Sequence, residues 1–263
     1  MRKLIMSDNQ VSIAVENIDI SIPNRTLIKS LTLSIKYKEF IAILGQNGCG
    51  KSLTLHTLAG VRLPASGEVK LMNENINNKA KRDIAKNLAL LTQDTEDIFP
   101  STVFDSVLIG RHPHISTFNN ESAEDILIAR DALNQVGLLD LESRDITTLS
   151  GGERRRLSIA QVLTQQPKIF LLDEPTNHLD PQYQLEVLKL FKAKVNLGCS
   201  VITTMHDVNL AARYATQCLL IFGDGNWIFG NTSKILNEEN LTKLYGIKIE
   251  KIETKKQIFF SAI

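Results

Sequence analysis

The pattern of apolar and polar positions divides the chain into two kinds of strand. From Val11 to Ile43 apolar and polar residues alternate, which is typical of antiparallel strands, with turns at Pro23-Asn24 and near Tyr37-Lys38. A strand is also predicted at Trp227–Gly230, after a hairpin turn at Gly223–Gly225. Short uninterrupted apolar runs indicate strands buried on both faces: Phe40–Leu44, Leu88–Leu91 and Ile169–Leu172. A further strand is predicted at Val201–Met205, which contains two threonines.

Helical periodicity occupies several intervals between these strands. Leu53–Leu58 marks the start of a helix, and Tyr183–Phe191 has the spacing of an amphipathic helix. Over Glu121–Val136 the apolar residues recur at helical spacing and stop before a glycine. Because Asp94–Thr148 has few β-branched runs, we expect a helical insertion there. Residues 231–263 form a short helical and extended tail, so the whole pattern predicts an α/β fold.

The segment between the first buried strand and the helix after it carries the first recognisable chemistry. Residues 45–52 read Gly-Gln-Asn-Gly-Cys-Gly-Lys-Ser, the G-x-x-x-x-G-K-S pattern of a phosphate-binding loop. Glycines let such a backbone aim its N–H groups at an anion, and the helix N-terminus adds partial positive charge. We expect Lys51 to reach the β- and γ-phosphates of ATP and Ser52 to ligate Mg²⁺. The predicted ATP contacts in this loop are Gly45, Asn47, Gly48, Cys49, Gly50, Lys51 and Ser52.

Two carboxylates follow the apolar run at Ile169–Leu172. Asp173 and Glu174 come at the end of this strand, and ligands bind at the carboxyl ends of the strands in an open parallel sheet. Asp173 is therefore expected to hold Mg²⁺ beside the phosphate-binding loop, and Glu174 to act as general base toward an attacking water. An isolated pair of this kind would more simply be a solvated acidic turn.

A third motif identifies a family resemblance. Residues 149–153 read Leu-Ser-Gly-Gly-Glu, which resembles the LSGGQ signature of ABC-type ATPases with Glu153 in place of the commoner Gln. The motif is also a helix N-terminus, because Ser150 can cap it and two glycines expose N–H groups that favour a phosphate. The resemblance implies that Ser150, Gly151, Gly152 and Glu153 contact the ATP of a partner subunit in a head-to-tail homodimer.

The remaining motifs occur in the order of the same family. Gln93 matches the Q-loop glutamine, which is implied to contact Mg²⁺ and the attacking water. Residues 177–180 match the D-loop, in which Asp180 is implied to cross the dimer interface. His206 matches the switch histidine, which contacts the γ-phosphate. The implied catalytic set is Glu174, His206 and Gln93, and the implied Mg²⁺ ligands are Ser52, Gln93 and Asp173.

The resemblance covers residues 11–250 and implies a single ABC ATPase domain. Its P-loop (RecA-like) core would combine residues 11–93, which include an N-terminal antiparallel β-subdomain, with residues 167–230. The helical subdomain at about 94–166 would touch a transmembrane partner, and residues 231–263 would form the C-terminal tail.

A narrower resemblance concerns residues 110–114, Gly-Arg-His-Pro-His. This segment is similar to the GR-x-P-H segment of ATPases that serve importers of iron chelates, haem and cobalamin, and molybdate importers carry related sequences. A loop with a helix-stopping Pro113 is the alternative interpretation. The resemblance implies a peripheral ATPase at the cytoplasmic face of the inner membrane. Its partners would be two permease subunits and a periplasmic or extracellular substrate-binding protein.

Two other functional classes stay open at this stage. Non-transport ABC ATPases act in DNA repair or on ribosomes, but repair members carry a long coiled coil between the nucleotide motifs. The interval from Lys51 to Asp173 has no room for one, and ribosome-acting members carry two ATPase units in a chain. Exporter ATPases are usually fused to a transmembrane domain. The cargo cannot be named, because the membrane and substrate-binding subunits read it.

Three positions depart from the family pattern. Ile22 aligns where an aromatic residue usually stacks on adenine, while Tyr37 is nearby but out of register. An aliphatic contact is weaker, since stacking on an aromatic contributes about 1–3 kcal/mol per base. Lys38 replaces a common glycine, which indicates an adjusted turn. Cys49 lies near a helix N-terminus, so we expect a lowered thiol pKa and loss of ATP binding on alkylation.

Composition limits the partners and the compartment. The chain has 263 residues and a formal net charge of +1, which argues against a nucleic-acid patch at Arg154–Arg156. The three cysteines are odd in number and widely spaced, which favours a reducing cytosol over a disulfide scaffold. No apolar run approaches the ~18 residues of a membrane span. Met1–Asp8 is too short in apolar length for a secretory signal.

Overall fold

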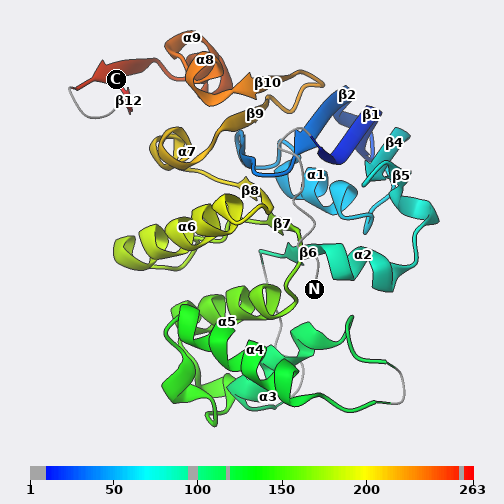
Figure 1. Cartoon of the computed structure of the whole chain (residues 1–263). Coiled ribbons are helices and arrows are strands. Elements are labelled where there is room, and N and C mark those ends of the chain that lie inside the picture. Colours follow the sequence, from blue (N-terminus) through cyan, green and yellow to red (C-terminus); the bar gives the residue numbers. More distant parts are fainter. Residues whose placement is uncertain (1–9, 94–99, 117–118, 255–257) are drawn as a thin grey trace.

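The computed structural model describes residues 10–93, 100–116, 119–254 and 258–263 (Figure 1). The expectation about a secretory signal at Met1–Asp8 and the predicted start of the helical insertion at Asp94 lie outside the described residues. None of the helices that these residues form combines the length and apolar character that a bilayer crossing requires.

The strands form three sheets. The strand orders are β2-β1-β4-β5, β10-β9-β3-β8-β7-β6 and β11-β12. The bounds are β1 (Val11–Ile22), β2 (Arg25–Lys36), β3 (Phe40–Leu44), β4 (Ser66–Leu71), β5 (Glu74–Asn75), β6 (Leu88–Leu91), β7 (Ile169–Leu172), β8 (Ser200–Thr204), β9 (Gln217–Ile221), β10 (Trp227–Asn231), β11 (Ile249–Glu253) and β12 (Ile258–Ala262).

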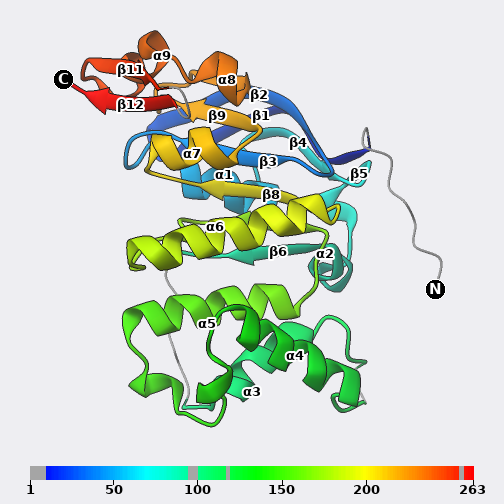
Figure 2. The same cartoon turned by 60° about the vertical axis from the view of Figure 1, so that its left-hand side comes forward.

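The helices cover the sheets and fill the insertion between β6 and β7 (Figures 1 and 2). The α-helices are α1 (Lys51–Leu58), α2 (Lys81–Asn87), α3 (Val103–Leu108), α4 (Ala123–Gln135), α5 (Gly151–Thr164), α6 (Pro181–Asn196), α7 (Val208–Tyr214), α8 (Thr232–Ile235) and α9 (Glu238–Tyr245). Short 3-10 turns are η1 (Ile76–Asn78), η2 (Ile109–Arg111), η3 (Leu139–Leu141) and η4 (Ile146–Thr148).

The six-stranded sheet explains why the motifs of the sequence meet. β6, β7, β8, β3 and β9 run parallel, and only the edge strand β10 runs antiparallel. The carboxyl ends of parallel strands lie at one edge, and each of the predicted catalytic segments follows such an end. The phosphate-binding loop follows β3, Gln93 follows β6, Glu174 follows β7 and His206 follows β8. Sheet topology therefore gathers residues that are far apart in the sequence.

One strand assignment from the alternating pattern was wrong. The alternation from Val11 to Ile43 predicted antiparallel strands, and β1 with β2 is indeed antiparallel. This interval overlaps Phe40–Leu44, whose uninterrupted apolar run separately predicted a buried strand. β3, however, pairs parallel to both β8 and β9. The physical reason is its burial on both faces. Phe40 packs into the core beneath α5 and α6, whereas Ile41 packs into the core against α1 and the four-stranded sheet.

The insertion between β6 and β7 contains α3 and α4, which pack against each other and against α5 (Figure 1, green). The helix predicted over Glu121–Val136 is α4. Ser122 begins it with a capping box, in which its hydroxyl accepts from the Asp125 N–H and the Asp125 carboxylate accepts from the Ser122 N–H. The helix stops before Gly137, whose φ of 66° lies in the left-handed region that favours glycine.

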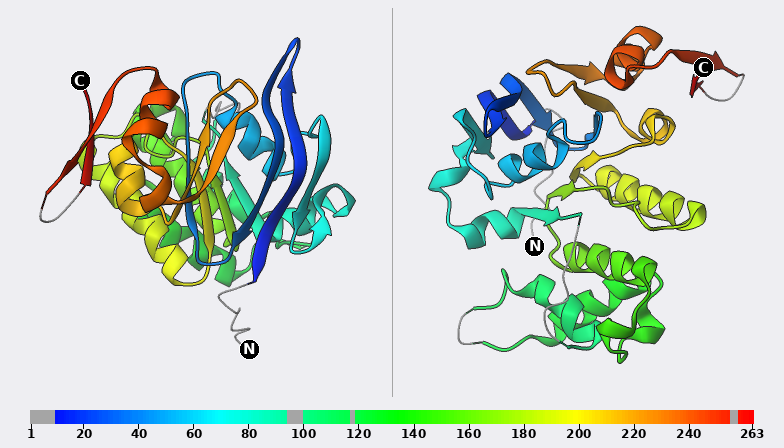
Figure 3. Two further views of the ribbon diagram at one scale, coloured as in Figure 1. Left: turned by 90° about the horizontal axis from the view of Figure 1, so that it is seen from above. Right: turned by 180° about the vertical axis from the view of Figure 1, so that it is seen from behind.

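The C-terminal elements pack against the rest of the fold. Figure 3 shows the β1–β2 hairpin and the β11–β12 hairpin at opposite sides of the molecule. β12 contacts α7, and α9 contacts β11. Leu241, Leu244 and Phe260 are buried in the same apolar core as Met205 and Ala211. The described residues of the predicted tail, 231–254 and 258–263, are therefore a packed part of the fold.

Candidate active site

A pocket of about 560 Å³ opens at the carboxyl edge of the six-stranded sheet. Its wall combines the phosphate-binding loop, the start of α1 and the segments that follow β6, β7 and β8. The lining residues are Ile22, Leu27, Asn47, Gly48, Gly50, Lys51, Ser52, Leu53, Gln93, Glu174, Asn177 and His206. Three predicted residues are buried and absent from this lining: Gly45, Cys49 and Asp173.

The phosphate-binding loop has the backbone that an anion cradle needs. Gly50 has a φ of 111° and precedes α1, so the first N–H groups of that helix are left without intrahelical acceptors. Lys51 lies over the loop, where its Nζ donates to the Gly45 carbonyl at 2.9 Å and to the Gln46 carbonyl at 3.1 Å. A phosphate oxygen in the pocket is a stronger, charged acceptor that would replace these carbonyls.

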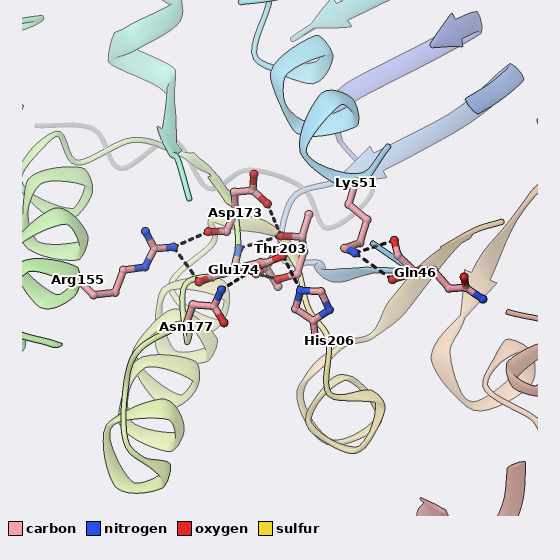
Figure 4. A network of polar contacts seen from close by, with 10 residues as sticks. Gln46, Lys51, Arg155, Asp173, Glu174, Asn177, Thr203 and His206 are labelled. Atoms are coloured by element: carbon pink, nitrogen blue, oxygen red, sulfur yellow. Dashed lines mark hydrogen bonds and ion pairs between the residues drawn. The ribbon is translucent and has the colours of Figure 1, made fainter. Parts of the chain in front are cut away.

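Glu174 is held between two side chains at the pocket wall (Figure 4). Its Oε1 lies 2.5 Å from His206 Nε2, and its Oε2 accepts from the Asn177 amide. The backbone of Glu174 has a φ of 47°, a conformation that an L residue adopts at a cost. The Glu174 side chain is 9% exposed, so its orientation is fixed by these partners and by the pocket.

Thr204 links the two carboxylate residues. Its hydroxyl donates to Asp173 Oδ1 at 2.6 Å and accepts from the Glu174 N–H at 2.8 Å. Thr204 was not predicted from the sequence, because it lies within a predicted strand and a threonine hydroxyl often bonds to the nearby backbone. Asn177 was placed only within the D-loop, although it lines the pocket and bonds to Glu174.

Arg155 fixes the ends of two strands. Its guanidinium donates to the carbonyls of Thr92 and Gln93 after β6 and of Asp173 and Glu174 after β7. The side chain is buried and comes from α5 (Figure 4). This contact joins the helix of the signature motif to the catalytic edge of the sheet.

The neighbouring arginines are also used inside the molecule. Arg154 donates to the carbonyls of Leu149 and Thr147. Arg156 donates to the Val136 carbonyl, and its Cζ lies 4.4 Å from the centre of the Tyr183 ring. All three basic residues of this run therefore make contacts within the fold.

The signature residues lie at the surface and outside the pocket lining. Ser150 caps α5, and its N–H donates to Glu153 Oε2 at 2.8 Å. These bonds from Ser150 lower the pKa of the Glu153 carboxyl. Asp180 is exposed as well, and its carboxylate caps α6 by accepting from the Tyr183 N–H. The structure thus places the signature residues and Asp180 outside their own chain's pocket, whereas Asn177 of the D-loop lines it.

The three departures from the family pattern have different outcomes. Ile22 lines the pocket and is 37% exposed, whereas Tyr37 is 1% exposed and cannot present its ring to a base. Lys38 has a φ of 65°, in the left-handed region, which explains why glycine is common there. Cys49 is 3% exposed, and burial raises the pKa of its thiol, so the expected lowered pKa is wrong. Removal from water outweighs the nearby Lys51.

This burial predicts slow modification of the loop thiol. Under native conditions, an alkylating reagent should label Cys49 at least about 10-fold more slowly than in urea, because labelling requires local opening. Mass spectrometry of the digested protein over a time course measures this. Cys199, which is half-buried, is the internal comparison and should label earlier. Equal native rates at the two cysteines would contradict the assigned burial.

The donor set in and beside the pocket fits a hard divalent cation. Ser52 and Gln93 offer oxygen donors at the wall, and Asp173 offers a carboxylate that is already oriented by Thr204. Hydroxyl, amide and carboxylate oxygens are the ligands that Mg²⁺ prefers. Together with a phosphate cradle and a positioned carboxylate, this arrangement defines a nucleotide-hydrolysing site of the P-loop class.

Comparison with known proteins defines the family. The ABC transporter family model matches residues 28–177, and the chain belongs to this family. It is 34% identical over 245 residues to the ferric enterobactin transport ATP-binding protein FepC of Escherichia coli (strain K12), with 92% of this chain and 90% of that protein covered. It is 37% identical over 240 residues to the iron(3+)-hydroxamate import ATP-binding protein FhuC of Bacillus subtilis (strain 168), covering 91% and 89%.

A solved structure agrees with this assignment. It is described as the inward-facing conformation of an ABC transporter provisionally assigned to the metal-chelate type. The TM-score is 0.83 at 31% identity, and the match covers 96% of this chain and 98% of that one. The predicted α/β ATPase-cassette fold and the predicted ATP hydrolysis are confirmed by these relationships.

Proposed function

We propose that this chain is the ATP-hydrolysing subunit of an ABC importer that takes up a metal chelate or molybdate/tungstate. The chelate would be siderophore-bound iron, haem or cobalamin, and separate permease subunits would conduct it. The proposal of ATP hydrolysis rests on the contacts by which His206 and Asn177 hold the Glu174 carboxylate beside the phosphate-binding loop. The proposal of an importer is supported by relatives that are named for the transport of ferric enterobactin and iron(3+)-hydroxamate.

Each pocket residue has a distinct role in this proposal. Lys51 and the N–H groups of its loop bind the β- and γ-phosphates. Glu174 accepts a proton from the attacking water, and His206 contacts the γ-phosphate while orienting Glu174. Ser52, Gln93 and Asp173 would hold Mg²⁺, which when bound neutralises charge on the phosphates. Ile22 provides an aliphatic contact for adenine.

The proposed working unit is a homodimer. Ser150, Gly151, Gly152 and Glu153 form an exposed or half-exposed helix N-terminus outside their own pocket. Such a terminus attracts phosphate, and in a head-to-tail dimer it would contact the partner's ATP. Asp180 would lie at the same interface. The dimer would sit peripherally at the cytoplasmic face of the membrane beneath two permease subunits, with a substrate-binding protein delivering cargo on the other side.

The proposed permease contact lies at the GR-x-P-H segment. Arg111 is buried there, with Nε 2.7 Å from Asp125 Oδ1 and a further bond to the Thr164 carbonyl. Ser122 and Arg111 hold the pKa of Asp125 at about 2, so the pair stays charged. The residues that follow Arg111 line a surface pocket of about 570 Å³. Its wall joins α2 to the insertion and includes Lys81, Arg82, Ala85, His112, Pro113 and Ile115.

Reconstitution tests the importer assignment. With a chelate or molybdate permease in liposomes, we expect the ATPase rate of this chain to rise about 5-fold or more, with uptake of the matching cargo. The Glu174→Gln variant in the same liposomes is the control and should support no uptake. Coupling to an amino-acid or sugar permease, and to none of the chelate or molybdate class, would refute the importer class and leave the ATPase intact.

A further inference from the structure

The described part of the C-terminal segment, residues 238–254 and 258–263, has no function in the scheme above, yet it contacts the phosphate-binding loop and the helix that follows His206. Within this segment, hydrogen bonds connect α9 to the β11–β12 hairpin. The Ile249 N–H donates to Thr242 Oγ1 at 3.0 Å, and the Lys251 N–H donates to Glu238 Oε1 at 2.7 Å. The two strands pair from Ile249–Ala262 to Glu253–Ile258.

The first contact joins this segment to the phosphate-binding loop. Gln46 Nε2 donates to the Leu244 carbonyl at 2.9 Å. This carbonyl lies in the last turn of α9, where carbonyls lack intrahelical donors. The backbone carbonyl of Gln46 accepts in turn from Lys51 Nζ and from the Cys49 N–H. Figure 4 shows the Gln46 side chain pointing away from the pocket, toward the orange C-terminal ribbon.

The second contact joins the segment to the helix that follows the switch histidine. Asn209 Oδ1 accepts from the Phe260 N–H at 2.8 Å, and Asn209 Nδ2 donates to the Phe260 carbonyl at 3.2 Å. The amide side chain of Asn209 thus supplies an acceptor and a donor to one residue of a strand. Asn209 lies in the first turn of α7, which Asp207 caps immediately after His206. Figure 2 shows β12 above α7.

Packing makes both contacts part of the ATPase core. Leu244 and Phe260 are buried in the same apolar cluster as Met205, which precedes His206. The hydroxyl of Tyr245 is buried too, and among the described residues no hydrogen-bond partner is found for it. Burial raises the pKa of Tyr245 to about 12, with Asp207 contributing in the same direction, so the phenol stays neutral.

We propose that Gln46 and Asn209 are positioning residues through which the C-terminal segment holds the phosphate-binding loop and the switch helix in the arrangement needed for hydrolysis. Gln46 acts on the binding of ATP, because it orders the loop that carries Lys51. Asn209 acts on the chemical step, because it fixes the helix that begins after His206. This inference rests on the proposed roles of Lys51 and His206.

Two substitutions should separate these effects in kinetics. Gln46→Ala removes the bond to Leu244, so ATP must order a looser loop when it binds. KM for ATP should therefore rise about 2- to 10-fold with kcat unchanged, a factor that corresponds to the net free energy of one hydrogen bond. Asn209→Asp keeps the shape but loses the donor to the Phe260 carbonyl. It should lower kcat by about the same factor with KM unchanged.

Matched controls are available on the far side of the molecule. Gln135→Ala removes an exposed glutamine whose amide donates to Asp131 within α4, and Asn78→Asp changes an exposed asparagine in η1. Both should match the wild type in KM and kcat. A general loss of stability would move the two parameters together, so thermal unfolding is measured for every variant.

Hydrogen exchange provides a readout that does not require hydrolysis. Without nucleotide, Gln46→Ala should speed amide exchange in residues 45–52 and leave residues 207–214 unchanged, whereas Asn209→Asp should do the reverse. If the wild type hydrolyses ATP but both variants match their controls in kinetics and exchange, the inference is overturned and the proposed function stands. If exchange changes as expected but the wild type shows no ATPase activity, the contacts are real and the proposed function fails.

Discussion

Glu174→Gln is expected to lower ATP turnover by about 100- to 10,000-fold, the range of a lost general base. A glutamine has nearly the shape of the native side chain but cannot accept the proton of the attacking water. The contacts from His206 and Asn177 to the native carboxylate show that its position is already set before ATP arrives. The phosphate-binding loop is untouched by the change, so ATP should still bind.

The measurement combines turnover, nucleotide binding and size. The variant should bind ATP with about the wild-type affinity and should form ATP-dependent dimers on a sizing column, because the closed state is no longer cleared by hydrolysis. Glu186→Gln is the matched control, since Glu186 is exposed on α6 and accepts from Gln182 on the same helix. Hydrolysis near the wild-type rate in the Glu174 variant would remove this residue from the role of base.

The parts of the site that could be predicted from the sequence are those formed by residues close together in the chain. The loop at 45–52 carries its glycines, its lysine and the start of α1 within eight positions, so its chemistry is local. Each proposed catalytic residue also follows a short, largely apolar segment, and such segments are typical of buried parallel strands. The pocket that joins Lys51, Glu174 and His206 was therefore predictable once the parallel sheet was assumed.

What the sequence did not predict depends on contacts between distant segments. Arg155 lay in a run of three arginines that look alike, and only its burial distinguishes it as the residue that joins β6 to β7. The position of Cys49 just before α1 predicted a lowered thiol pKa. Burial instead raises the pKa of this thiol, and burial depends on contacts with distant residues that local sequence does not show. The contacts of Gln46 and Asn209 with the C-terminal segment belong to the same class.

Mixing two inactive variants should test the composite sites of the proposed dimer. Lys51→Ala removes the phosphate-binding amine, and Ser150→Arg places a bulky cation at the cap of α5. Each alone should lower turnover about 100-fold or more, the size of a lost phosphate contact in the transition state. In a head-to-tail dimer, one intact pocket re-forms when the wild-type loop of one chain meets the wild-type signature of the other.

The recovered activity has a calculable ceiling. Random mixing makes about half of the dimers mixed, and each of these has one intact site of two, so at most about a quarter of the wild-type activity should return. If each chain completed its own site, both chains would stay defective and mixing would restore nothing. Ser122→Arg removes a similar cap from α4 and is the matched control for helix capping alone.

If mixing restores no activity, dilution distinguishes a working monomer from a dimer whose two sites must act together. The separation of Ser150 from its own pocket predicts that turnover per chain falls as dimers dissociate, because a monomer lacks the second phosphate contact. A dimer whose two sites must act together would also show this fall, while giving no recovery on mixing. Turnover that stays proportional to protein concentration down to high dilution would instead indicate a working monomer, and the proposed role of Ser150 would be abandoned.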